Sequence, residues 1–173
     1  MNLAEQVAAF VADEDGVEAL DDTTWRFPFG TGNSEFSVIV AARDVNLLVY
    51  ATRLDPVSAE RVDAVQELIA DLNPELTTAW FECNREDGVV SARAGLDTEQ
   101  IEVGSVLIGN VVGSAVAAMS RFKSAVDAVA AGAITPQQIR ELPDPNAAPT
   151  LDLDEATADE ADAFLREHLP DQS

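Results

Sequence analysis

The sequence has few residues that could hold a metal ion or act as a catalytic base. Its 173 residues include one cysteine, Cys83, and one histidine, His168. One cysteine excludes an internal disulfide framework and a cysteine-cluster zinc site. A histidine-metal, His-Cys or Ser-His-Asp site would depend on His168, which lies near the C-terminus without a suitable partner. We therefore expect no catalytic residue, no metal and no cofactor, and predict that the chain is not an enzyme.

Basic residues are also scarce. Acidic side chains outnumber basic ones 32 to 10, the only lysine is Lys123, and the formal net charge is -22. This charge disfavours binding to nucleic acid or to an anionic membrane, so a neutral or basic protein is the better partner. Residues 1–16 lack the basic and apolar regions and the cleavage site of a signal peptide, which predicts a cytoplasmic protein.

The longest uncharged run covers residues 103–120, VGSVLIGNVVGSAVAAMS. Its length meets the usual minimum for a membrane span, but glycine, serine and alanine dilute its apolar content and it has one leucine. It also contains a GxxxG motif, Gly109 to Gly113, which allows close helix packing. A heptad stripe continues beyond the run on both sides, through Ile101, Ile108, Val112, Ala115, Met119, Phe122, Val126 and Val129. The stripe predicts one long helix from Ile101 to Gly132 whose inner face meets a sheet, with no membrane contact.

The first half of the chain shows one amphipathic helix and three strands. Apolar residues at helical spacing follow Asn2, which is a candidate cap. Alternating residues predict strands at 25–29, 36–42 and 45–54, with Pro28 suggesting an edge position for the first. Short connections make these an antiparallel meander. Residues 30–34, GTGNS, contain GxG but no following helix, so we interpret them as a hairpin loop rather than a phosphate site.

A second helix and a hairpin follow. Asp55 and Pro56 are typical of a helix start, and Asn73 with Pro74 of its end. Strands at 79–84 and 89–96 then pair so that Phe81 faces Ala92 and Cys83 faces Val90, which predicts Cys83 as a small buried apolar residue. On the other face Trp80 meets Arg93 and Glu82 meets Ser91. The Trp80–Arg93 pair is either a cation–π contact framing a recognition surface or a stabilising cross-strand pair.

The C-terminal region differs in composition. Thr135, Pro136 and Gln138 predict a capped short helix that reaches about Leu142. Residues 141–173 then carry ten acidic side chains and one arginine, Arg166, after a proline-containing linker. Thr157 and Glu160 form a possible capping box for a weak terminal helix with Ala161, Phe164, Leu165 and His168. We expect a domain at 1–142 and an acidic segment at 143–173 that docks on the same domain or a sister subunit.

The order of elements is helix, three strands, helix, two strands and a long helix. That order, with residues 80–82 (WFE), 86–90 (EDGVV) leading into 93–96 (RAGL), and 131–139 (AGAITPQQI), resembles the YbjN family over residues 1–142. Its members are described as putative bacterial sensory transduction regulators and are similar in fold to type III secretion chaperones. The resemblance implies an α+β domain with one twisted antiparallel sheet and helices packed on it. It also implies a dimer and no catalytic residues.

The third strand suggests an interaction surface. Residues 47–50, LLVY, are apolar on both faces, and Ile39 and Ala41 add apolar surface opposite Phe36. A sheet that is apolar on both faces needs cover on both, from the same chain, a second subunit or a protein partner. On the long helix, Leu107 and Val111 lie on a second side that is also too apolar to face solvent. The candidate partner or dimer surface comprises Ile39, Tyr50, Trp80, Arg93, Leu107 and Val111.

These observations support two functional hypotheses. The first is a non-enzymatic protein-binding domain, a chaperone-like or regulatory adaptor that acts as a homodimer. The alternative is a small-molecule-binding domain or enzyme with a carboxylate-lined pocket between the sheet and the long helix.

Overall fold

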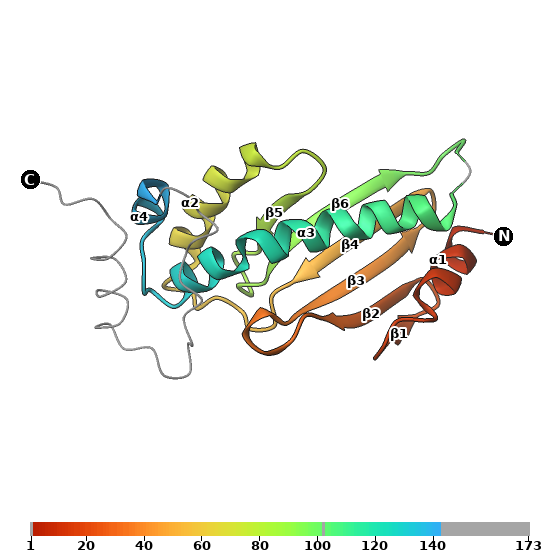
Figure 1. Cartoon of the computed structure of the whole chain (residues 1–173), viewed down its shortest axis with the longest axis horizontal. Helices are drawn as coiled ribbons and strands as arrows, with labels where there is room; N and C mark the ends of the chain where they lie inside the picture. The colour runs from red at the N-terminus through yellow and green to blue at the C-terminus, as the bar shows by residue number, and fades with distance from the viewer. Residues whose placement is uncertain (1, 102, 143–173) are drawn as a thin grey trace, which may run out of the picture.

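The computed structural model describes residues 2–101 and 103–142, which form an α+β domain (Figure 1). Its six-stranded antiparallel sheet has the order β1-β2-β3-β4-β6-β5. The strands are β1 (Glu18–Asp21), β2 (Thr24–Phe29), β3 (Phe36–Arg43), β4 (Asn46–Thr52), β5 (Trp80–Cys83) and β6 (Val90–Asp97). The helices are α1 (Leu3–Val11), α2 (Val62–Leu72), α3 (Ser105–Ala130) and α4 (Pro136–Glu141), with 3-10 turns η1 (Gly32–Ser34) and η2 (Asn73–Glu75). The predicted terminal helix at 157–168 lies outside the described residues.

The predicted strand pairing is confirmed. β2, β3 and β4 form the antiparallel meander, and β5 pairs with β6 in the expected register, Trp80 with Arg93 and Cys83 with Val90. The connection between β3 and β4 is short, as predicted, and Asp44 within it has a φ of 50°. Residues 30–34 form the loop of the β2–β3 hairpin and contain η1. The domain therefore follows the alternation of its sequence closely.

One strand was missed. β1 pairs with β2, so β2 is not the edge of the sheet. β1 begins at Glu18, which lies opposite Arg26, so Pro28 lies beyond the part of β2 that pairs with β1. A proline is tolerated there because its missing N–H would have had no partner in β1. Pro28 therefore has no partner in β1, as at an edge, but the prediction that the whole strand is an edge strand is wrong.

The ends of the helices are set partly by tertiary contacts. α1 begins after Asn2, whose side chain accepts a hydrogen bond from Glu5 N, and α4 has the predicted capping box between Thr135 and Gln138. The predicted start of α2 at Asp55 is wrong, because the helix begins at Val62. The N–H of Val57 instead donates to the carbonyl of Gly88, 2.8 Å away, and this holds the segment against the β5–β6 turn.

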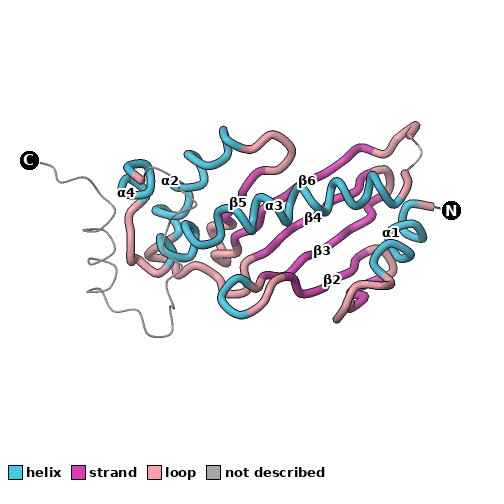
Figure 2. The backbone as a smooth tube through the Cα atoms, in the orientation of Figure 1, coloured by secondary structure: helices cyan, strands magenta, loops and turns pink. Residues whose placement is uncertain are grey.

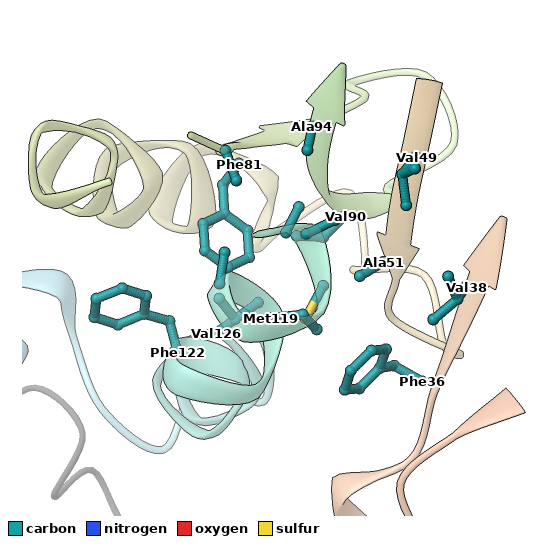
Figure 3. Close-up of a cluster of buried hydrophobic side chains, with 14 of the residues drawn as sticks. Phe36, Val38, Val49, Ala51, Phe81, Val90, Ala94, Met119, Phe122 and Val126 are labelled. Carbon is teal, nitrogen blue, oxygen red and sulfur yellow. The ribbon is translucent and has the colours of Figure 1, made fainter. Parts of the chain in front are cut away.

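α3 is the long helix that the heptad stripe predicts, although it begins at Ser105 instead of Ile101. It crosses the sheet, with α1 toward one end and α2 and α4 toward the other (Figures 1 and 2). Within α3 the stripe is buried except for half-buried Val112, whereas Ile101 lies before the helix and is 45% exposed. α3 packs mainly on β4 and β6. Met119 and Phe122 point into the same cluster as Phe36 and Phe81 (Figure 3). By length and composition α3 could also cross a membrane. Its packing on the sheet accounts for its apolar stripe without one.

The described helices pack on one face of the sheet, which we call the helix-covered face. The core cluster combines residues of the four helices with alternate residues of the strands, such as Val38, Val49 and Ala92. Residues of the opposite face, including Ile39 and Tyr50, do not belong to this cluster. We call this opposite face the helix-free face.

Candidate protein-binding surface

One row of side chains crosses the helix-free face from edge to edge. Directly paired residues of antiparallel strands point to the same face of a sheet. The registers of the five strand pairs therefore align six side chains, which we call the central row: Glu18, Arg26, Ile39, Tyr50, Arg93 and Trp80. Four of the six residues predicted for a partner or dimer surface, one on each of β3, β4, β6 and β5, are thus neighbours.

Arg93 lies between two aromatic rings of the central row. Its guanidinium carbon is 5.3 Å from the Trp80 ring centroid and 5.5 Å from that of Tyr50, both within cation–π range. Its Nη1 lies 3.8 Å from a carboxylate oxygen of Glu82. The Nε of Arg93 is buried and has no hydrogen-bond acceptor among the described residues. Trp80 remains 42% exposed, so the predicted pair stabilises the hairpin and also presents an aromatic ring to the surface.

The arginines of the helix-free face are each matched by a carboxylate. Arg26 pairs with Glu18 at 2.5 Å, Arg43 with Asp21 at 3.8 Å, and Arg93 with Glu82. Hydrogen bonds from the backbone N–H and the hydroxyl of Thr23 lower the pKa of Asp21 and so favour its carboxylate form. With Asp97 on β6 as one further carboxylate, the face is close to neutral in a chain whose net charge is -22.

A second row, of small hydroxyl side chains, runs beside the central row. Ser37, Thr52 and Ser91 lie on the three middle strands, and the hydroxyls of Thr52 and Ser91 are 2.9 Å apart. We call these three residues the hydroxyl row. The face is hollowed at both ends of it, by about 310 Å³ beside Ser37 and Leu54 and by about 390 Å³ beside Ser91 and Glu82. The surface there is a furrow next to the bulkier central row.

On the other side of the central row lie Ala41, Leu48 and Gly95, and the Leu48 side chain occupies the space there. Leu48 lies opposite Gly95, and its Cδ2 is 3.1 Å from where a Cβ on Gly95 would be. Ala41, paired with Leu48, is 5% exposed although it is outside the core cluster, so its neighbours on the sheet bury it. Among the described residues, the hollows beside the central row lie on the side of the hydroxyl row.

The other two predicted surface residues lie elsewhere. Leu107 and Val111 are on α3, over the helix-covered face. Leu107 is half-buried, whereas Val111 is 9% exposed and belongs to the core cluster. The packing of α3 within this chain therefore already covers Val111.

The outer side of α3 borders a separate groove of about 460 Å³. Small residues of α3, including Gly109 and Gly113, line one wall, residues 76–79 line the other, and Arg121 lies at the groove as well. A Cβ at Gly109 would lie 3.5 Å from the Phe10 ring, whereas one at Gly113 would meet nothing within 4 Å. Of the GxxxG motif, only the first glycine thus lies close to another helix of the domain.

The outer edge of β5 is closed by side chains. Asn73 accepts a hydrogen bond from the N–H of Phe81 at 2.6 Å and donates one to its carbonyl at 3.1 Å. Gln66 donates to the carbonyl of Cys83 at 3.3 Å. These side chains occupy the backbone groups that an added strand would need, so β5 is a poor site for strand addition.

The described residues offer little for catalysis. They include no group of three or more His, Cys, Asp or Glu side chains placed to hold a metal ion. Cys83 is half-buried beside the core, less deeply than expected, and burial raises its thiol pKa, which favours the unreactive neutral form. Between the sheet and α3, where a carboxylate-lined pocket was the alternative, apolar side chains such as Val49, Met119 and Val126 fill the space (Figure 3).

The comparison with protein families is decisive for the class of this chain. The YbjN family model, described as a putative bacterial sensory transduction regulator, matches residues 3–128. The chain belongs to the YbjN family. The match spans α1 through most of α3, including every strand of the central row. The motifs at 80–82, 86–90 and 93–96 lie within it, whereas the motif at 131–139 lies beyond it. No curated protein matches the chain. Membership of YbjN is consistent with a regulatory or adaptor role.

Proposed function

We propose that this YbjN protein is a non-enzymatic, chaperone-like or regulatory adaptor that binds protein and acts as a homodimer. The observation that carries the proposal is the central row, in which Ile39, Tyr50 and Trp80 remain partly exposed on a face that no described helix covers. Tryptophan, tyrosine and arginine are enriched among the residues that dominate protein interfaces. A face with this composition is suited to a protein partner.

The charges restrict where a second copy can dock. With a net charge of -22, two copies repel each other over most of their surface. On the helix-free face, Arg26, Arg43 and Arg93 are each matched by a carboxylate. This face is where two acidic chains can approach with the least repulsion.

The same charge supports the rest of the proposal. Nucleic acid and anionic membranes would be repelled, which leaves protein as the proposed partner. A cytoplasmic location and the absence of a bound cofactor are further parts of the proposal. The test is the molar mass of the full chain in solution, measured by light scattering at micromolar concentration. A mass near twice 18.4 kDa supports the homodimer, and a mass of 18.4 kDa at every concentration contradicts it.

A further inference from the structure

The central row and the hydroxyl row have complementary shapes. On β3, β4 and β6 their residues alternate two apart, Ile39 with Ser37, Tyr50 with Thr52, and Arg93 with Ser91. At a rise of about 3.4 Å per residue, the two rows run about 7 Å apart. One is a ridge of large side chains and the other a furrow of small ones, hollowed at both ends.

A ridge beside a parallel furrow is complementary to its own copy. Consider a two-fold axis that lies parallel to the rows, midway between them and just above the sheet. Rotation about this axis brings a second sheet face to face with the first and places its ridge over the first furrow. The same operation places the first ridge over the second furrow, as an isologous interface requires.

We infer that two copies pair through their helix-free faces in this way, with the central row of each in the hydroxyl furrow of the other. This inference rests on the proposed homodimer and specifies its geometry. Facing sheets pack about 10 Å apart, so Tyr50 of one copy lies over Thr52 of its partner. By the same operation, Arg93 of one copy lies over Ser91 of its partner.

Site-specific cross-linking tests this geometry. In a Cys83→Ser background the chain has no other cysteine, so a single new thiol reports one position. We would introduce Thr52→Cys in the furrow, Asn46→Cys at the far end of the same strand, and Ala117→Cys on the outer side of α3. Each full-length variant is treated with a short bismaleimide, after circular dichroism has shown that it folds.

The inferred axis brings the two Thr52 positions close together and keeps the two Asn46 and the two Ala117 positions far apart. We therefore expect the Thr52→Cys variant to form covalent dimers, at least tenfold more than either control. Ser37→Cys, in the same furrow, is expected to behave like Thr52→Cys and replaces it if that variant does not fold.

The outcomes separate this inference from the proposed function. If light scattering shows a dimer but Asn46→Cys or Ala117→Cys cross-links instead, the homodimer stands and the inferred geometry is wrong. A dimer in which none of the cysteines cross-links overturns the geometry as well. A monomeric mass at all concentrations contradicts the homodimer itself.

Discussion

The side chain of Asn73 satisfies backbone groups at the outer edge of the sheet. It makes one hydrogen bond to each backbone group of Phe81 on the outer edge of β5, and Phe81 itself is 2% exposed. Without Asn73, a donor and an acceptor would be left in a poorly hydrated place. Removing one partner of a buried hydrogen bond costs more than the bond itself contributes, because the remaining group stays unsatisfied.

We predict that Asn73→Ala lowers the free energy of unfolding by about 1–3 kcal/mol, measured by urea denaturation. Asn110→Ala is the matched control, because the Asn110 side chain is exposed on α3. An Asn73→Ala variant as stable as this control would show that the β5 edge does not depend on Asn73.

The second prediction at this scale concerns Arg93 and Trp80. Their contact lies on the surface, where cation–π pairs contribute about 0.5–1 kcal/mol. A double-mutant cycle with Arg93→Ala and Trp80→Ala, measured by chemical denaturation, is expected to give a coupling free energy of this size. Arg85 and Asp63, an ion pair that is largely exposed, provide the control cycle with a coupling near zero. Strict additivity of the Arg93 and Trp80 variants would contradict the contact.

At the scale of elements, α3 supplies much of the core. Phe122 is fully buried and contacts Phe81 edge to face, with ring centroids 6.3 Å apart. We predict that Phe122→Ala lowers the free energy of unfolding by about 3–5 kcal/mol through the cavity it leaves. Val106, at 77% exposure on the same helix, is the control, and its change to alanine should alter stability by less than about 0.5 kcal/mol. Equal effects would mean that α3 does not pack on the sheet as described.

α3 is also long and apolar enough to cross a membrane. Because its stripe packs on the sheet, we predict that the full chain stays in the supernatant after ultracentrifugation of a lysate without detergent. Sedimentation of the chain with the membrane fraction, reversed by detergent, would contradict this.

The sequence predicted elements best where the signal was local. The β5–β6 register followed from a short turn and from the separate character of Phe81 and Trp80 on the two faces. β1 was missed because its four residues, EALD, include two acids and lack β-branched side chains. The start of α2 was misplaced because Asp55 and Pro56 look like a cap, whereas Val57 is held by Gly88, 31 positions along the chain.

The candidate surface shows the same limit. Ile39 and Tyr50 were predicted as surface residues because they make the second face of the sheet apolar. Trp80 and Arg93 were predicted because they face each other across the β5–β6 hairpin. The alignment of these four residues in one row depends on the pairing of β4 with β6, which are far apart in the chain. The hydroxyl row was missed because serine and threonine have no distinctive signal in a strand. Val111 was selected for its apolar character, and the core accounts for that character.

At the scale of the whole molecule, the described helices cover one face of the sheet and leave the other face without a helix (Figure 1). The chain has a strong negative charge, whereas its helix-free face is close to neutral and carries the central row with its aromatic and apolar side chains. Together with membership of the YbjN family, this arrangement supports an adaptor that works through its sheet.

The most direct test of this account compares the solution mass of the wild-type chain with that of Ile39→Glu, by light scattering across a range of concentrations. Ile39 is half-buried in the middle of the central row, where a carboxylate would have to be buried against the second copy. Val106→Glu adds the same charge on exposed α3 surface and serves as the control. We predict that the wild type and Val106→Glu are dimers and that a folded Ile39→Glu variant is a monomer. An Ile39→Glu variant that dimerises as tightly as the wild type would contradict the role of the helix-free face.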